Sequence, residues 1–193
     1  MIQNLAAREV GFTSNVFLVA GERTVLVDVG SQFDVVSAVL EFVGNVDAVV
    51  LTHTHPDHVG NLEAVRDAFD LEVWGYDTTQ AGVDHEIADG ETVLLGDDEY
   101  EALHTPGHKN DHLCFYAPDP EILFVGDLIF ANGGFGRTDL PEGDRGLLVD
   151  SIQRVLDTVD ESLTELHSGH GPSVTTNPYH DVEIALQAAK MSA

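Results

Sequence analysis

The chain has little of two things on which many proteins rely, cysteine and positive charge. It has one cysteine, Cys114, in 193 residues, so an internal disulfide is excluded. It has 8 lysines and arginines against 34 aspartates and glutamates, which gives a formal net charge of −26. We therefore expect no binding to nucleic acid, because phosphate recognition needs clustered basic side chains.

Long apolar runs are also missing. No run approaches the ~20 residues of a membrane span, and the N-terminus lacks a basic segment followed by an apolar one. The sequence therefore predicts no membrane association, no signal peptide and a cytoplasmic location. With 43% hydrophobic residues, residues 1–193 are sufficient for a single globular domain with a substantial core.

The acidic excess has a physical consequence for folding. Self-repulsion at a net charge of −26 strains an ordinary fold at low salt. At molar salt the screening length falls to ~3 Å, and most of that repulsion disappears. An acidic, lysine-poor surface resembles that of cytoplasmic proteins from salt-loving microbes, so we expect a halophilic source. The alternative is an acidic protein matched to a basic partner.

The most informative stretch is residues 52–58, which reads Thr-His-Thr-His-Pro-Asp-His. Imidazole nitrogens and carboxylate oxygens in such a cluster are typical ligands of zinc and similar divalent ions. Alternate residues of an extended segment share a face, so His53 and His55 are expected to hold one metal. Asp57 and His58 follow at the bend into a helix and are expected to turn toward a second position. The stretch predicts a metal-dependent hydrolase.

Apolar patterns on either side of this stretch predict a mixed α/β (α+β) fold. A fold of two sheets packed face to face with helices outside accommodates the order of the elements. Strands are predicted near residues 15–20, 24–28, 47–51, 71–74, 92–95, 100–104, 112–117, 122–125 and 164–167. Helices are predicted near residues 33–43, 62–69, 148–159 and 177–189.

Three later segments each place a His or Asp at a strand end or in the loop that follows, beside glycine. These residues are His108, Asp127 and His170. Glycine beside a polar residue permits the close backbone approach that a tight site requires. Each segment alone is weak evidence, since Asp and His-Gly-Pro are common in turns. Their order behind the histidine cluster makes the joint pattern specific.

At this point the chain resembles the metallo-β-lactamase superfamily, from Asp28 to Pro172. The resemblance implies a four-layer αββα sandwich with the site at one edge of the two sheets, and it implies Asp28 as a residue that orients the ligand loop. It also implies two sets of metal ligands with Asp127 bridging both ions. The first set is His53, His55 and His108, and the second is Asp57, His58 and His170.

Within the superfamily, the chain is most similar to glyoxalase II (hydroxyacylglutathione hydrolase) and its single-domain relatives. The segments that carry this likeness are 104–108, 126–130, 136–139 and 169–172. Two-domain glyoxalase II enzymes have a helical C-terminal part that helps to bind glutathione, whereas the residues after His170 suffice for one helix. Lys109 is a second departure, since that family tends to have a small residue there.

The resemblance implies hydrolysis of a small thioester or ester by a bridging hydroxide. Two divalent ions ~3.5–4 Å apart share such a hydroxide and lower its pKa to near neutrality. Zinc is the expected metal, with iron or manganese as alternatives. Asp57 and Asp127 are the candidate catalytic residues, with Asp57 as acceptor of the water proton. Lys109 and Arg137 are candidate substrate anchors, although they equally fit pairing with surface carboxylates.

Three other residues are expected to serve hydrogen bonding or packing. His104 and His112 flank the ligand loop and either hydrogen-bond to ligand residues or serve structure. Cys114 lies in an apolar strand and is expected in the core.

Three alternative functions stay open at this point. A persulfide dioxygenase of the same superfamily uses one iron and shares the segment 136–139. A lactone or ester hydrolase requires no thiol partner. A non-catalytic metal-binding protein predicts tight metal binding without turnover. The oligomeric state and the acyl and thiol parts of a substrate are not encoded in any recognisable pattern.

Overall fold

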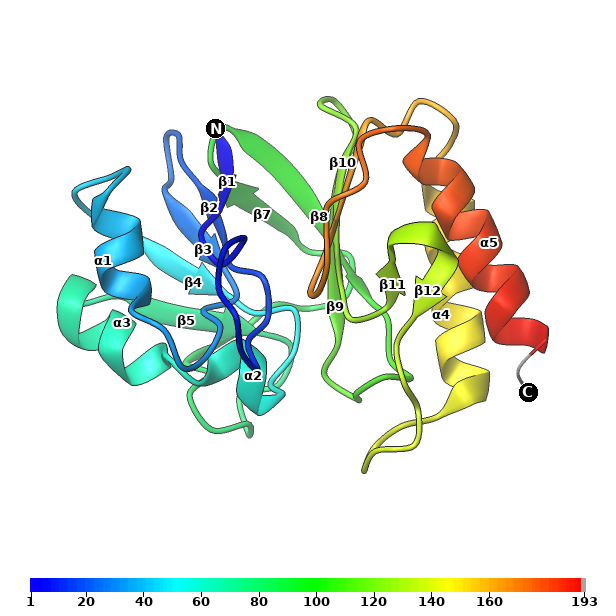
Figure 1. Ribbon diagram of the computed structural model, residues 1–193, viewed down its shortest axis with the longest axis horizontal. Coiled ribbons are helices and arrows are strands. Elements are labelled where there is room, and N and C mark those ends of the chain that lie inside the picture. The colour runs from blue at the N-terminus through cyan, green and yellow to red at the C-terminus, as the bar shows by residue number, and fades with distance from the viewer. Residues whose placement is uncertain (192–193) are drawn as a thin grey trace. The chain divides into compact units, whose positions relative to one another are not determined.

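The computed structural model describes residues 1–191 and divides them into two compact units. Unit 1 comprises Met1–Ile87 and Val93–Glu99, and unit 2 comprises Ala88–Thr92 together with the chain from Tyr100 onward. The expectation of a single domain over residues 1–193 stays a prediction, and its last two residues lie outside the described part. Figure 1 traces the chain through both units.

Unit 1 contains a six-stranded sheet in the order β1-β2-β3-β4-β5-β6. The first three strands are antiparallel, and β3 to β6 are parallel. The strands are β1 (Ile2–Asn4), β2 (Phe17–Val19), β3 (Val25–Val27), β4 (Ala48–Val50), β5 (Glu72–Gly75) and β6 (His85–Glu86). Every residue of β3 and β4 is buried, as expected for parallel strands covered on both faces.

Three helices connect the strands of unit 1. They are α1 (Val35–Leu40), α2 (Pro56–Val59) and α3 (Leu62–Phe69). The Asp34 side chain caps α1 by accepting from the Ser37 N–H. α1 and α3 contact each other, and their buried residues Val39 and Val65 share one core cluster with strand residues such as Leu26. The ligand stretch therefore follows a fully buried strand.

Unit 2 carries most of a five-stranded sheet in the order β13-β10-β9-β8-β7. These strands are β7 (Thr92–Leu95), β8 (Asp98–His104), β9 (Leu113–Ala117), β10 (Ile122–Gly126) and β13 (Glu165–Ser168). A small hairpin of β11 (Ile129–Phe130) and β12 (Gly134–Phe135) follows β10, with the short 3₁₀ helix η1 (Ala131–Gly133) between its strands. β10 pairs antiparallel with β9 and parallel with β13, and its register shifts between Phe124 and Gly126.

Two long helices complete unit 2, α4 (Arg145–Thr158) and α5 (Pro178–Met191). They lie side by side in Figure 1, and α5 also contacts the β11-β12 hairpin. Ile152 of α4 and Ala185 of α5 are buried in one cluster with strand residues such as Leu123. The apolar faces predicted for both helices are confirmed, and Pro178 opens α5 as its sequence position predicts.

The predicted mixed α/β class is confirmed, since each unit has a sheet flanked by helices. Among residues 1–191, no helix is both long and apolar enough to cross a lipid bilayer.

Candidate metal centre

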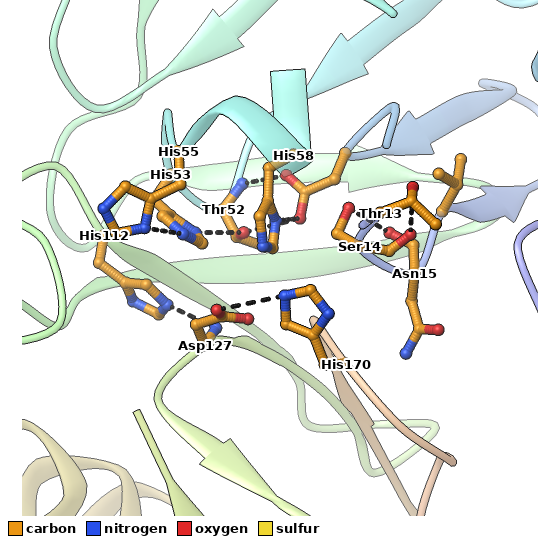
Figure 2. A network of polar contacts seen from close by, with 12 residues as sticks. Thr13, Ser14, Asn15, Thr52, His53, His55, His58, His112, Asp127 and His170 are labelled. Carbon is orange, nitrogen blue, oxygen red and sulfur yellow. Dashed lines mark hydrogen bonds and ion pairs between the residues drawn. The ribbon is translucent and has the colours of Figure 1, made fainter. Parts of the chain in front are cut away.

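In unit 1, three of the predicted ligands contact one another. His53 Nε2 lies 3.0 Å from His55 Nδ1, and the rings of His53 and His58 are centred 4.0 Å apart. Two nitrogens that each lie about 2.0–2.1 Å from one ion are roughly 3 Å apart, so the His53 and His55 nitrogens fit a shared metal. Figure 2 shows the three rings gathered at the end of the ligand loop. The three side chains therefore lie together within this unit.

Asp28 organises that cluster from the end of β3. Its carboxylate accepts hydrogen bonds from the Thr52 N–H at 2.8 Å, the Thr52 hydroxyl at 2.7 Å and His58 Nδ1 at 2.7 Å. Asp28 adopts φ +58°, an unusual conformation for a residue with a side chain. A carboxylate that receives imidazole N–H leaves the opposite nitrogen, Nε2 of His58, as the metal-binding atom.

The same reasoning fixes the tautomer of His53. The Thr52 hydroxyl has one proton, which it donates to Asp28, so its oxygen accepts from His53 Nδ1 at 3.1 Å. Nε2 of His53 therefore carries the lone pair, and it is the atom that faces His55. Thr52 is thus a functional residue that the sequence analysis missed, although its position inside the ligand stretch is itself a usable signal.

Asp57 lies in the first turn of α2, which Pro56 opens. It is buried, and one of its carboxylate oxygens lies within 4.8 Å of a ring nitrogen of His58. Its carbonyl accepts the Ser14 N–H at 3.1 Å, which ties the loop around Ser14 to this turn. The bend at Pro56 therefore brings Asp57 and His58 together, as the sequence predicts.

In unit 2, Asp127 lies between two predicted histidine ligands. Its Oδ2 atom is 3.5 Å from Nε2 of His108 and 3.5 Å from Nε2 of His170. Figure 2 shows the contact between Asp127 and His170. A single carboxylate oxygen at equal distance from two imidazole nitrogens fits a ligand that serves a metal on each side. The three later ligands of the sequence prediction are therefore brought together within this unit.

His108 is oriented by a main-chain carbonyl. Its Nδ1 donates to the Arg137 carbonyl at 2.8 Å, which leaves Nε2 for a metal. The neighbouring Gly136 has no room for a side chain, because a Cβ atom there would lie 2.0 Å from the Asp127 carbonyl oxygen. Gly107, at φ +130°, is equally constrained by α4, whose Leu148 nitrogen would lie 2.2 Å from a Cβ. Glycines thus let the ligand loops approach each other.

The two predicted substrate anchors have different environments. Lys109 is buried, and its ammonium lies 3.2 Å from Asp111 and 3.4 Å from Glu142. The Arg137 side chain is exposed and pairs with Asp139 through two hydrogen bonds of 2.8 and 2.7 Å, which lower the pKa of Asp139 to about 2. Their role as anchors stays a prediction.

The remaining singled-out residues support packing or the ligand loops. Cys114 is fully buried, and burial raises its pKa to about 12, so the thiol stays protonated in the core. His104 contacts the Asn110 carbonyl at 2.8 Å, whereas His112 contacts the main chain of Asp127. Only His112 of this pair therefore touches a predicted ligand residue through these bonds.

Known proteins are similar to this chain in sequence and in fold. A probable metallo-hydrolase of Bacillus subtilis, YqgX, is 31% identical over 178 residues, covering 81% of this chain and 83% of the relative. A hydroxyacylglutathione hydrolase of an Enterobacter species is 37% identical over 144 residues, covering 74% of this chain and 55% of the relative, so this chain spans about half of that protein. The di-iron-bound crystal structure of TTHA1623 is 30% identical with a TM-score of 0.75, covering 97% and 96% of the two chains.

A sequence profile agrees with these likenesses over most of the chain. It describes the metallo-beta-lactamase superfamily and matches residues 10–170, which include all seven predicted ligands and Asp28. By this match, the chain belongs to the metallo-beta-lactamase superfamily.

Proposed function

We propose that the two ligand sets together hold a pair of divalent metal ions and that the chain hydrolyses a thioester. The observation that carries this proposal is the position of Asp127 Oδ2, 3.5 Å from Nε2 of both His108 and His170. A carboxylate shared by two imidazoles is the ligand that a two-metal site needs at its centre. The identity of 37% to a hydroxyacylglutathione hydrolase favours a thioester among acyl substrates.

The donor atoms fit hard or borderline divalent ions. With the shared Asp127 included, each set combines imidazole nitrogens with carboxylate oxygen and contains no thiolate. We propose zinc as the ion, with iron or manganese as alternatives; a relative at 30% identity is described in a di-iron-bound form. In the proposal Asp127 would serve both ions. His53, His55 and His108 would hold one ion, and Asp57, His58 and His170 the other.

Ions of this kind, when bound, supply an activated water nucleophile and polarise the carbonyl of an acyl substrate. The chain's own residues then have two tasks. Asp28 and Thr52 fix the tautomers of His58 and His53, so that the donor nitrogens face the ions. Asp57, buried beside them, is proposed to take the proton of the water. The leaving thiol has an ordinary pKa of about 8.5, so it departs as thiolate with little need of an acid.

Two cations of unit 2 are proposed to take part in substrate binding. Arg137 is exposed and lies one residue beyond Gly136, which touches both His108 and Asp127. We propose that its guanidinium exchanges part of its pairing with Asp139 for a carboxylate of the substrate. We propose that Lys109 supports the loop that carries Arg137 through its ion pair with Glu142.

The test measures metal content and turnover on the same preparation. Protein purified without added metal is analysed for zinc, iron and manganese, and thiol release is followed with a hydroxyacylglutathione thioester and with thioesters of other thiols. Two ions per chain and thioester turnover are expected. One iron per chain with oxygen uptake on a persulfide would instead establish the dioxygenase alternative. Tight metal without turnover on any acyl substrate would establish a binding protein.

The assays need high salt as a variable. At a net charge of −26, raising KCl from 0.1 M to molar concentration shortens the screening length from ~10 Å to ~3 Å. We propose that the chain belongs to a salt-loving organism, and we expect both the melting temperature and the turnover to rise with KCl. A melting temperature that is independent of salt would contradict the proposed halophilic origin and leave the hydrolase proposal intact.

A further inference from the structure

One peptide group in unit 2 connects two of the ligand-bearing loops with a buried histidine. It is the peptide between Gly126 and Asp127, at the end of β10 where the register with β13 shifts. Its carbonyl accepts the N–H of Gly169, the neighbour of His170, at 2.7 Å. Its N–H donates to Nε2 of His112 at 3.1 Å. Figure 2 shows Asp127 with His112 on one side and His170 on the other.

The hydrogen bonds determine the tautomer of His112. A main-chain N–H is only a donor, so Nε2 of His112 accepts and carries no proton. The proton is therefore on Nδ1, which donates to the Thr105 hydroxyl oxygen at 2.8 Å. The Thr105 hydroxyl proton then turns to the Leu103 carbonyl at 3.4 Å or to Cys114 Sγ at 3.3 Å. His112 and Thr105 are fully buried, so both contacts are shielded from water.

The backbone at this point is conformationally permissive. Gly126 adopts φ +46°, a region that glycine enters without steric cost and leaves as readily. The turn is closed by the Leu128 N–H, which donates to the Val125 carbonyl at 3.0 Å, and the peptide within it is held by two further contacts. Those contacts are the Gly169 N–H on one side and the His112 ring on the other.

We propose that His112 is a positioning residue for the metal centre. Through Nε2 it holds the Gly126–Asp127 peptide, and thereby directs the Asp127 carboxylate to the midpoint between His108 and His170. Thr105 acts one step further away by keeping the His112 proton on Nδ1. The proposal rests on the proposed function, in which Asp127 is a metal ligand.

Two substitutions of similar size separate this role from simple packing. In His112→Gln, the end of the side chain reaches the place of Nε2 and offers an acceptor to the Asp127 N–H. In His112→Asn, the shorter side chain reaches only the place of Nδ1 and leaves that N–H without its acceptor. His180→Asn, on the exposed face of α5, controls for the loss of an imidazole from the chain.

The readout is zinc affinity by competition with a chromophoric chelator, together with the melting temperature of the metal-free proteins. We expect His112→Asn to bind zinc about 10- to 100-fold more weakly, the usual effect of removing a residue that orients a ligand. His112→Gln is expected to stay close to wild type. Equal zinc affinity of the Asn and Gln variants would overturn the proposal.

Two further variants keep the test decisive. If His112→Asn does not fold, Thr105→Val removes the acceptor of the Nδ1 proton, and unchanged zinc affinity in that variant would overturn the proposal. Asp127→Ala tests the proposed function separately. Wild-type zinc binding by Asp127→Ala would refute Asp127 as a ligand. If Asp127→Ala loses zinc binding but His112→Asn binds zinc as wild type does, the positioning role alone is refuted.

Discussion

The two units present their ligands in opposite ways. In unit 1, four predicted ligands lie within residues 53–58, on the loop after one buried strand and in the first turn of α2. In unit 2, three predicted ligands lie at His108, Asp127 and His170, on three loops brought together by a sheet. The first arrangement depends on local chain geometry, and the second depends on contacts between segments distant in sequence.

The residues that support the ligands differ accordingly. In unit 1 a charged side chain, Asp28, receives three hydrogen bonds and orders the loop. In unit 2 the support comes from main-chain groups, such as the Arg137 carbonyl and the Gly169 N–H, from the neutral His112 ring, and from glycines at which two segments pack closely. Substitutions near the predicted ligands of unit 1 should therefore act mainly through electrostatics, and those near the predicted ligands of unit 2 mainly through steric fit.

The largest effect is expected at Asp127. Asp127→Ala removes the carboxylate proposed to contact both ions, so thioester turnover should fall by more than about 100-fold and both ions should be lost. His55→Ala removes a proposed ligand of one ion, so turnover should also fall by more than about 100-fold while one equivalent of metal remains. Elemental analysis and thiol release measure both. Wild-type turnover in either variant would show that the proposed mechanism is wrong.

Steric fit in unit 2 is tested at Gly107, which precedes His108. Gly107→Ala adds a Cβ that would lie 2.2 Å from the Leu148 nitrogen, at φ +130°, so we expect a destabilisation of about 3 kcal/mol. Gly171→Ala is the matched control, because its φ is +76° but nothing lies within 4 Å of the added atom. That variant should lose only about 1 kcal/mol. Urea unfolding compares the two, and equal losses would show that backbone conformation alone matters.

The contrast between the units also explains what the sequence reveals. The geometry of the cluster at residues 52–58 follows from the local sequence. Alternate residues of an extended segment share a face, which places His53 beside His55, and Pro56 begins the turn of α2. The later ligands are recognisable only through their order and the resemblance to a family. Nothing local in the sequence indicates that the Arg137 carbonyl, rather than its side chain, holds His108.

The same limit applies to the secondary structure. The long helices α4 and α5 and the apolar strands β3 and β4 follow from periodicity, because each buries a continuous face. The sequence does not predict β1, β6, β11 or β12: β1 has one apolar residue in three, and the other strands have two residues each, too few to form a pattern. They form because neighbouring strands of the same chain supply hydrogen-bond partners.

Electrostatic support in unit 1 is tested at Asp28. Asp28→Ala removes the acceptor of the buried Thr52 N–H and of His58 Nδ1, which should cost about 1–3 kcal/mol of stability and lower metal affinity about 10- to 100-fold. Asp28→Asn keeps one acceptor oxygen and tolerates φ +58°, so its losses should be smaller. Chelator competition and urea unfolding measure both. An Asn variant as weak as the Ala variant would assign the effect to charge alone.

The smallest effect concerns His167, which supports the His170 loop of unit 2. Its Nδ1 lies 2.8 Å from the Ser173 hydroxyl, so the bond joins the two ends of that loop. Burial lowers the pKa of His167 below its ordinary value of 6.5, although Glu165, 3.1 Å away, acts in the opposite direction. The folded chain therefore binds the proton less readily than the unfolded chain does.

The sign of the pH dependence follows from this difference. Above about pH 6.5 the imidazole is neutral in both states, and below it the unfolded state takes up the proton first, so His167 lowers stability as pH falls. His167→Gln keeps a hydrogen-bonding side chain without this titration. The urea midpoint of wild type, measured relative to that of His167→Gln, should fall between pH 7.5 and pH 5.5. A difference that stays constant with pH would show that folding does not lower the pKa of His167.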